Sequence, residues 1–592
     1  MRQPQENEFT THDGSTLFYR CWPAVDGHGG HKGPDGGSDS GGRSVLLLHR
    51  GHEHSGRLQH VVDELALAGY AFFAWDARGH GRSPGTRGDS PDFATLVKDL
   101  EFFSRHVEAH HGLPRTKMVV IAQSVGAVLA ATWAHDYAPP VRGLVLTAPA
   151  FKVKLYVPLA RPGLRLLTRC FGNFFITSYV KPKFLTHDPE RVRSYGEDPL
   201  ITSTISARVL LGLFDAGERV IADAAAIRLP VQLLISGQDW VVHRAPQESF
   251  YQRLGSPVKE RHLLPGFLHD TLGERDRRQA LDKIRAFIER LFTDPPPADS
   301  LRQADHYGYT ADEERRLREP LSLLSPRHWQ FACTRLAMRH LGTLSDGIRL
   351  GLNDGFDSGA SLDYVYRDQA SGRGPLGKRI DRNYLDAIGW RGIRVRRRHL
   401  IEAIIAAGKR LPETHIVDLA AGHGRYLLDA LPSLPAPPRS VLLRDVDPRN
   451  VASAQALAAE RGYAAIVRGE TGDAFDEVAL VALAALTPRP NLVIVSGLYE
   501  LFADNERVCR SLRGIASAVD AGGLLVYTGQ PWHPQIELIA RTLTSHRNRQ
   551  PWVMRRRTQA ELDELVADAG FEKLTQWIDE WGLFTVSLAR RR

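Results

Sequence analysis

Cysteine is scarce in this sequence, and the few cysteines present form no cluster. None belongs to a CxxC pair; the four are Cys21, Cys170, Cys333 and Cys509. A disulfide framework or a structural zinc site needs cysteines at close, regular spacing. The pattern therefore predicts no metal site. It is typical of a reducing compartment, so we expect a cytoplasmic protein.

Long hydrophobic runs are also absent. Met118–Ala134 is interrupted by a Gln-Ser pair and a glycine, and Val478–Thr487 is short. A membrane-spanning helix takes about 20 apolar residues, so we expect no integral membrane segment. The polar stretch Met1–Thr10 lacks the apolar core of a signal peptide.

Neither sign of charge dominates. Lys and Arg number 76 against 68 Asp and Glu, a net charge of +8 over 592 residues. This mild excess allows transient contact with an anionic membrane surface, but it is more typical of an ordinary basic protein. Three basic runs are interpreted as solvated faces, and we expect no nucleic-acid partner; the runs are Val395–His399, Met554–Thr558 and Ala589–Arg592.

The length exceeds that of one ordinary core. Both halves alternate strand-like and helical runs, which predicts an α/β fold built on parallel sheets. Three consecutive prolines in Thr293–Gly308 predict a linker between domains 1–292 and 309–592. The glycine-rich stretch Asp26–Arg43 predicts a flexible loop, and its His28 and His31 are read as loop residues, not metal ligands.

A nucleophile is indicated within Met118–Ala134. A β-branched apolar run is followed by Gln-Ser-Val-Gly and then by an alanine-rich helical run. This is the strand–turn–helix context of a nucleophile elbow, with Ser124 at the sharp turn. Gly126 supplies one of the small residues that the turn needs, and Ala122 stands where glycine is usual.

Two further motifs carry a family resemblance. His49–Leu58 and Asp76–Gly85 match HGxGEHxxRY and DxxGHGxSxG signatures. Residues 10–290 thus resemble the monoacylglycerol lipase and lysophospholipase branch of the α/β-hydrolases, within the serine aminopeptidase-like family. The resemblance implies a helical cap at about 151–205 and a serine hydrolase acting on monoacylglycerol-like or lysophospholipid-like esters. The apolar, aromatic and basic segment Phe151–Leu185 suits an acyl chain with an anionic head group, or ordinary packing of the cap.

The resemblance also assigns the other members of a catalytic triad, in the order Ser…Asp…His. Asp239 ends a buried strand and His269 follows the last strand. A serine hydroxyl needs an imidazole to take its proton, and the imidazole needs a carboxylate to fix its tautomer. His262 and Asp270 are the rival candidates, although each lies off the family position.

Two backbone N–H groups are expected to form the oxyanion hole. Val125 follows the nucleophile, and Gly51 holds the matching motif position. Arg50 and His52 replace the family's glycines, which leaves a different path for this loop open.

The C-terminal half begins with a ligand-loop pattern. Thr414–Leu431 is an apolar strand, an acidic residue, a small-residue turn and a helix. Small residues let the backbone pass close to a nucleotide-like ligand. Four further strand patterns follow; they are Ser440–Val451, Ala464–Phe475, Asn491–Phe502 and Gly522–Pro534.

This half resembles the class I methyltransferases that use S-adenosylmethionine, and specifically the methyltransferase domain found fused behind α/β-hydrolases. The resemblance implies a Rossmann-like fold with S-adenosylmethionine as the methyl donor. It assigns Asp418, Gly422 and Gly424 to the methionine portion, Asp447 to the ribose and Asp473 to the adenine amino group. We expect a small molecule or a lipid as the methyl acceptor.

Two alternatives accompany this assignment. Asp445 competes with Asp447 for the ribose, since both would share one strand face and only the residue nearer the exit would reach it. An NAD-binding Rossmann domain is the other reading. It lacks support because GxGxxG spacing is missing, and the strand pair predicted at Thr575–Ala589 favours a methyltransferase. Ala420 replaces the first glycine of GxGxG.

The methyl acceptor leaves few marks. The fourth strand ends in Ser496–Phe502, not in the Asn/Asp-Pro-Pro-aromatic motif of amino-group DNA methyltransferases. Tyr499, Glu500 and His533 lie near strand ends and are candidates to take an acceptor proton. The helical extension 311–411 is expected to shape the acceptor pocket.

Two broader hypotheses stay open. In the first, both halves are enzymes; in the second, one half is a catalytically inactive binding module, as the altered oxyanion loop and Ala420 would allow. The hydrolase half could also be a thioesterase or a peptidase, because triad chemistry serves all three leaving groups.

Overall fold

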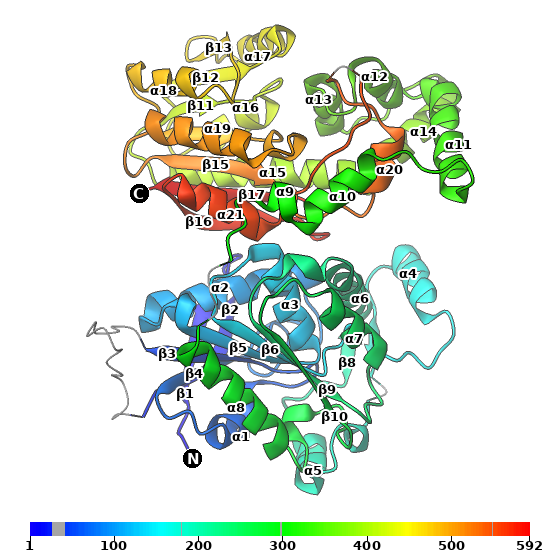
Figure 1. The fold of residues 1–592 in the computed structure, drawn as a ribbon, viewed down its shortest axis with the longest axis vertical. Helices are drawn as coiled ribbons and strands as arrows, with labels where there is room; N and C mark the ends of the chain where they lie inside the picture. The colour runs from blue at the N-terminus through cyan, green and yellow to red at the C-terminus, as the bar shows by residue number, and fades with distance from the viewer. Residues whose placement is uncertain (26–41, 179, 296–298, 548) are drawn as a thin grey trace. The chain divides into compact units, whose positions relative to one another are not determined.

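The computed structural model describes residues 1–25, 42–178, 180–295, 299–547 and 549–592. Contacts between Cα atoms divide the chain into two compact units, Met1–Ala298 and Asp299–Arg592 (Figure 1). His28 and His31, interpreted as loop residues, lie outside the described residues. Among the described residues, no helix combines the length and the apolarity that crossing a bilayer requires.

The N-terminal unit is an α/β-hydrolase fold around an eight-stranded sheet of order β1-β2-β4-β3-β5-β6-β9-β10. β2 pairs antiparallel with β1 and β4, and the strands from β4 to β10 are parallel. The strands are β1 (Gln5–Thr10), β2 (Thr16–Trp22), β3 (Arg43–Leu48), β4 (Tyr70–Trp75), β5 (Met118–Gln123), β6 (Gly143–Thr147), β9 (Val231–Ser236) and β10 (Lys259–Leu264).

Helices cover both faces of this sheet, as parallel strands require. Apolar side chains of α1 and α8 form one core with residues of β3, β4 and β5, while α2, α3 and α6 pack on one another (Figure 1). The helices are α1 (Gln59–Glu64), α2 (Phe93–His111), α3 (Val125–Tyr137), α6 (Ala207–Ala222), α7 (Arg244–Arg253) and α8 (Arg278–Thr293), with 3₁₀ turns η1 (Ser55–Leu58), η2 (Arg115–Lys117), η4 (Ala224–Ala226) and η5 (Thr271–Gly273).

The segment between β6 and α6 forms the cap. It contains the helices that the sequence predicts, and also a short antiparallel pair of strands, β7 with β8. Its elements are α4 (Ala160–Phe171), β7 (Phe175–Thr177), η3 (Pro182–Phe184), α5 (Pro189–Glu197) and β8 (Thr204–Ser206).

The C-terminal unit is a Rossmann-like methyltransferase fold. Its seven-stranded sheet has the order β13-β12-β11-β14-β15-β17-β16, and β17 runs antiparallel to both neighbours. This antiparallel pair is the C-terminal feature that favours a methyltransferase over an NAD-binding domain. The strands are β11 (His415–Asp418), β12 (Ser440–Asp445), β13 (Val467–Thr471), β14 (Leu492–Val495), β15 (Leu524–Gly529), β16 (Phe571–Ile578) and β17 (Thr585–Arg591).

Alternating side chains supply the cores on the two faces of this sheet. Ile416 and Ile494 pack toward α15, α16 and α17, whereas Val417 and Val493 pack toward α18, α19 and α21. These helices are α15 (Ile388–Gly408), α16 (Arg425–Ala430), α17 (Pro448–Glu460), α18 (Glu477–Val481), α19 (Asn505–Ala518) and α21 (Gln559–Asp568). The unit also contains α20 (Ile536–Thr542) and the 3₁₀ turns η7 (Leu431–Ser433), η8 (Ala482–Ala485) and η9 (Tyr499–Leu501).

A helical extension precedes this sheet. It starts inside the stretch read as a linker, because α9 already covers Ala304–Tyr307. The later helices pack near α15 and α20 (Figure 1). The extension consists of α9, α10 (Tyr309–Arg318), α11 (Pro326–His340), η6 (Gly342–Leu344), α12 (Asp346–Asp354), α13 (Gly359–Arg367) and α14 (Gly374–Leu385).

Candidate active sites

Ser124 lies at the turn from β5 into α3. Its φ of 56° and ψ of −113° are uncommon for a residue with a side chain. The same turn brings Gly126 close to the loop that follows β3. A Cβ at position 126 would lie 2.6 Å from the carbonyl oxygen of His49 in that loop. Glycine is therefore required at 126. Ala122, where glycine is usual, is fully buried in β5.

The three predicted triad residues form one chain of hydrogen bonds. His269 Nε2 lies 2.7 Å from Ser124 Oγ, and His269 Nδ1 lies 2.7 Å from Asp239 Oδ2. The other oxygen of Asp239 accepts the N–H groups of Val241 and Val242, at 2.7 and 2.9 Å. Burial raises the pKa of Asp239, but the charge of His269 and these hydrogen bonds outweigh it, so that the pKa lies below its ordinary value.

The rival residues are held elsewhere. Asp270 Oδ1 accepts from Gln123 Nε2 at 2.9 Å, and its Oδ2 faces the guanidinium of Arg191 at 3.2 Å. His262 lies on β10 with its Nε2 3.2 Å from Glu260. Asp270 thus links the loop that carries His269 to Arg191 of the cap. Neither Asp270 nor His262 is hydrogen-bonded to Ser124.

The two predicted oxyanion donors are neighbours. A Cβ built on Gly51 would lie 3.1 Å from Val125 Cγ2. The unusual Arg50 is buried, donates to Glu53 Oε1 at 2.7 Å and places its guanidinium 5.2 Å from the ring centre of Tyr195 in the cap. Its bulk is therefore accommodated by a charged partner and an aromatic ring.

A cavity of about 170 Å³ adjoins this serine. Its walls come from the sheet, from α2, α3 and α6, and from the cap, and they are mostly apolar. They include Leu48, Phe93, Leu96, Leu129, Leu155, Ile176, Val180, Val209, Leu210 and Leu213.

In the C-terminal unit, the loop after β11 has the geometry of a ligand cradle. Gly422 and Gly424 have positive φ values of 54° and 65°. A Cβ on Gly422 would meet only the Cα of Gly359, at 3.7 Å, so that space is left above the loop. The N–H of Gly422 donates to Asp445 Oδ2 at 2.9 Å, which ties this loop to the end of β12.

Asp418 is fully buried at the end of β11. Its Oδ2 accepts from the hydroxyl of Tyr426 at 2.5 Å, whereas its Oδ1 has no hydrogen-bond partner among the described residues. Burial, with a smaller contribution from the charge of Asp445, raises the pKa of Asp418 to about 7. A cation placed against Oδ1 would stabilise the ionised form.

The structure corrects the reasoning about the two aspartates after β12. Asp445 and Asp447 do not share a strand face, because β12 ends at Asp445 and Asp447 is the N-cap of α17. Asp447 accepts from the N–H of Arg449 and pairs with its guanidinium at 2.8 Å. Asp445 is buried and accepts the N–H of Gly422, whereas Asp447 makes no contact with the glycine loop among the hydrogen bonds of the described residues.

Asp473 lies on the loop after β13. It is exposed, and its Oδ1 accepts from the N–H of Phe475 at 2.9 Å. Its assignment to the adenine amino group stays a prediction.

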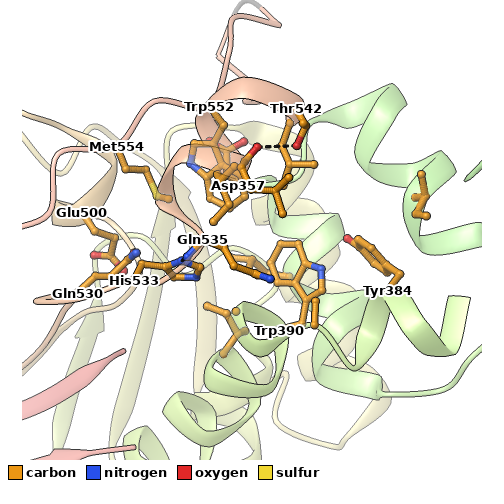
Figure 2. A pocket seen from close by; sticks show the side chains of 18 of the residues that line it. Asp357, Tyr384, Trp390, Glu500, Gln530, His533, Gln535, Thr542, Trp552 and Met554 are labelled. Carbon is orange, nitrogen blue, oxygen red and sulfur yellow. Dashed lines mark hydrogen bonds between the residues drawn. The ribbon is translucent and has the colours of Figure 1, made fainter. Parts of the chain in front are cut away.

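Two neighbouring cavities meet beyond the glycine loop. The smaller, of about 40 Å³, is lined by residues 420–426, by Ser496 and by residues of α13. The larger, of about 370 Å³, is shown in Figure 2. Leu362 and Arg396 line both, and Ser496 of the first is followed in sequence by Gly497 of the second.

Of the three residues predicted to take a proton from the methyl acceptor, two line this cavity and one does not. Glu500 and His533 line the larger cavity (Figure 2). Tyr499 instead packs into the core behind the sheet, where its hydroxyl lies 3.0 Å from Ser511 Oγ.

Comparisons with known proteins agree with this architecture. Residues 284–591, more than half of the chain, match the family described as "Putative methyltransferase", and residues 41–276 match "Serine aminopeptidase, S33". The protein YnbC of Escherichia coli (strain K12), itself described as uncharacterized, is 54% identical over 596 residues, covering 100% of this chain and 99% of YnbC. The chain belongs to the "Putative methyltransferase" family.

The hydrolase unit has relatives of its own. A monoacylglycerol lipase of Mycolicibacterium smegmatis is 26% identical over 256 residues, which is 42% of this chain and 89% of the lipase. A solved monoglyceride lipase from Saccharomyces cerevisiae is 21% identical, with a TM-score of 0.41, and covers 49% of this chain and 95% of that one. The family match of residues 41–276, together with the Mycolicibacterium smegmatis relative, shows that this member of the methyltransferase family carries a hydrolase unit of the monoglyceride lipase type.

The interpretation of the basic runs as solvated faces is wrong for several of their arginines in this family member. Arg396 is buried and donates to Glu500 at 2.8 Å. The three arginines 555–557 are each at most 4% exposed. They bond to Glu561, Glu313 and the carbonyl of Tyr499, at 2.6 Å in each case. The partners of Arg396, Arg556 and Arg557 lie far away in sequence, so no local pattern could have predicted their burial. Glu561, in contrast, is close in sequence to Arg555.

Replacing the triad carboxylate tests the hydrogen-bond chain. Asp239→Asn should lower kcat for p-nitrophenyl esters by about 10⁴, because an amide would favour the wrong imidazole tautomer. Asp270→Asn is the matched control, since it removes an adjacent buried carboxylate that does not contact His269 Nδ1; it should change kcat by less than about tenfold. Steady-state kinetics on variants with unchanged thermal unfolding provide the measurement. Full activity of Asp239→Asn would show that another carboxylate orients the imidazole.

Proposed function

We propose that the protein is bifunctional, with a serine ester hydrolase in residues 1–292 and an S-adenosylmethionine-dependent methyltransferase in residues 309–592. The hydrogen-bond chain from Ser124 through His269 to Asp239, beside an apolar cavity, carries the first activity. The donor cradle at the end of β11 carries the second. The residues between these ranges would serve as the linker.

In the hydrolase, His269 takes the proton of Ser124 as Oγ attacks the ester carbonyl carbon. The N–H groups of Gly51 and Val125 bind the oxygen that becomes negative. His269 then returns the proton to the departing alcohol, and a water molecule, activated by the same imidazole, releases the acid and restores the serine.

The substrate class follows from the cavity walls. Their apolar side chains suit a single acyl chain, and relatives named monoacylglycerol lipase align with this unit. We infer an ester of the monoacylglycerol or lysophospholipid type, whose small polar head would lie toward the solvent side of the cap.

Open polar groups at the donor site support S-adenosylmethionine as its ligand. Two buried oxygens there, Asp418 Oδ1 and Ser496 Oγ, have no hydrogen-bond partner among the described residues. Asp418 would hold the ammonium of the methionine portion, Asp445 the ribose and Asp473 the adenine, while Gly422 leaves room for the ligand. When bound, the donor supplies an electrophilic methyl group on a sulfonium.

Removing the nucleophile tests the hydrolase directly. Ser124→Ala should lower p-nitrophenyl ester hydrolysis by on the order of 10⁴–10⁶ and abolish labelling by a fluorophosphonate probe. Ser203→Ala, at an exposed serine of the cap, should behave as the unaltered protein. Binding of S-adenosylmethionine should be unchanged in both. Persisting esterase activity in Ser124→Ala would refute the assignment.

The ribose contact can be tested with the two neighbouring aspartates. Asp445→Asn should weaken S-adenosylmethionine binding by roughly ten- to a hundredfold, because charge-assisted hydrogen bonds to the ribose are worth about 1.5–3 kcal/mol. Asp447→Ala removes the N-cap of α17, so it should lower thermal stability, by about 1 kcal/mol, more than it lowers affinity. Isothermal titration calorimetry measures the two affinities, and thermal unfolding measures the stability. The reverse order of affinities would restore the original assignment to Asp447.

The raised pKa of Asp418 predicts a pH dependence of donor binding. Near pH 8 the carboxylate is ionised and attracts the ammonium; as the pH falls below about 7 it gains a proton in the free protein. Affinity should therefore fall toward about tenfold per pH unit below 7, with proton release on binding near neutrality. Asp418→Asn should bind weakly and without this dependence. A flat profile for the unaltered protein between pH 6 and 8 would contradict the role of Asp418.

A further inference from the structure

The larger cavity of the C-terminal unit has the size and the aromatic lining that suit an apolar ligand. At about 370 Å³ it falls in the size range of small-molecule sites. The rings of Trp390 and Trp552 are stacked, with centres 6.2 Å apart and planes inclined by 27°, and Tyr384 lies 5.5 Å from Trp390. Flat aromatic walls of this kind favour a flat, apolar ligand.

One end of this cavity is polar and incompletely hydrogen-bonded. Glu500 Oε2 and Gln530 Nε2 are buried, and neither has a hydrogen-bond partner among the described residues. Glu500 follows β14 and Gln530 follows β15, and these two strands are paired in the sheet. Figure 2 shows the two side chains close together. An acceptor and a donor left open side by side fit a ligand group that both donates and accepts, such as a hydroxyl.

The charges at this end favour a neutral ligand. The carboxylate of Glu500 is balanced by Arg396, whose Nη1 lies 2.8 Å from Oε1. His533 is neutral, because burial lowers its pKa to about 4. Its Nδ1 accepts from the N–H of Gln535 at 3.1 Å, which leaves a proton on Nε2. A ligand carboxylate would be repelled by Glu500 and would have no cation to pair with. A ligand cation would gain little, because Arg396 already neutralises the charge of Glu500.

The position of the cavity beside the proposed donor site indicates that its ligand is the methyl acceptor. Leu362 and Arg396 line both this cavity and the donor pocket, so a ligand held by Glu500 lies beside the proposed donor site. An aliphatic alcohol is far too weak an acid to lose its proton to a carboxylate, whereas a phenol ionises near pH 10, as tyrosine does. The aromatic walls point the same way.

Resting on the proposed methyltransferase function, we propose that this cavity binds an apolar phenol as methyl acceptor, with Glu500 Oε2 taking the phenolic proton. The phenolic oxygen forms the new O–CH₃ bond, the methyl–sulfur bond of the donor breaks with its electron pair left on sulfur, and the proton goes to Glu500. Gln530 Nε2 donates to the oxygen and orients it.

Ligand binding to the full-length protein tests the recognition without any turnover. The probes are 2-naphthol, naphthalene and 2-naphthoate, each titrated by calorimetry in the absence of donor. Naphthalene should bind about tenfold more weakly than 2-naphthol, because it satisfies neither open polar atom. The carboxylate of 2-naphthoate should bind more weakly still. Equal binding of naphthalene and 2-naphthol, or tightest binding of 2-naphthoate, would overturn the proposal.

Glu500→Gln tests the proton transfer. It should change 2-naphthol affinity by less than about threefold but lower the formation of 2-methoxynaphthalene by about 10²–10⁴, the usual contribution of a general base. A nitro-substituted naphthol that is already ionised at the assay pH should restore the rate in this variant. Glu506→Gln, at an exposed glutamate of α19, is the matched control and should change neither quantity. A variant as fast as the unaltered protein, or one that the ionised naphthol does not rescue, refutes the role of Glu500.

Titration with S-adenosylmethionine distinguishes a failure of the phenol proposal from a failure of the proposed methyltransferase function. Donor binding without any naphthol binding would overturn the phenol proposal alone. Naphthol binding without donor binding would overturn the methyltransferase function and leave only the recognition of the ligand.

Discussion

Parallel strands buried on both faces can carry few charges, and their carboxyl ends all meet at one edge of the sheet. The organisation of both units depends on this constraint. In the N-terminal unit Ser124 follows β5 and Asp239 follows β9. In the C-terminal unit Asp418 ends β11 and Asp445 ends β12. Polar groups excluded from the strands are therefore concentrated where a substrate can reach them.

The strained turn at Ser124 illustrates how the sheet positions a side chain. The preceding strand is held by hydrogen bonds to β3 and β6 on either side, so the positive φ of the serine is imposed by structure around it. The packing of Gly126 against the backbone of His49 then holds the turn at Ser124 close to the loop that follows β3. Arg50, unusual at its position, is compatible with this arrangement because Glu53 and Tyr195 surround its guanidinium.

Buried ion pairs play a different part in the C-terminal unit. Arg396 and Arg556 pair with carboxylates distant in sequence, whereas Arg555 pairs with the nearby Glu561. Taking such cations out of water is costly unless they are paired. The Arg396–Glu500 pair joins α15 to the turn η9 after β14, and the Arg556–Glu313 pair joins the C-terminal segment to α10 of the helical extension. One of them, between Arg396 and Glu500, also leaves the polar end of the large cavity without net charge, while Glu500 keeps one oxygen open.

The sequence by itself predicted both fold classes, because strand–helix alternation and ordered loop motifs are local properties of the chain. It also predicted Ser124, Asp239 and His269, whose hydrogen bonds then appear in the structure while their catalytic role stays a prediction. Only the tertiary structure showed that Asp445 ends β12 while Asp447 caps α17, since the end of β12 depends on pairing with β11 and β13; which of the two contacts a ribose stays a prediction. Tertiary structure alone brought Trp390 to Trp552 and Glu500 to Gln530, because contacts between distant segments arise from packing and leave no periodic signal along the chain.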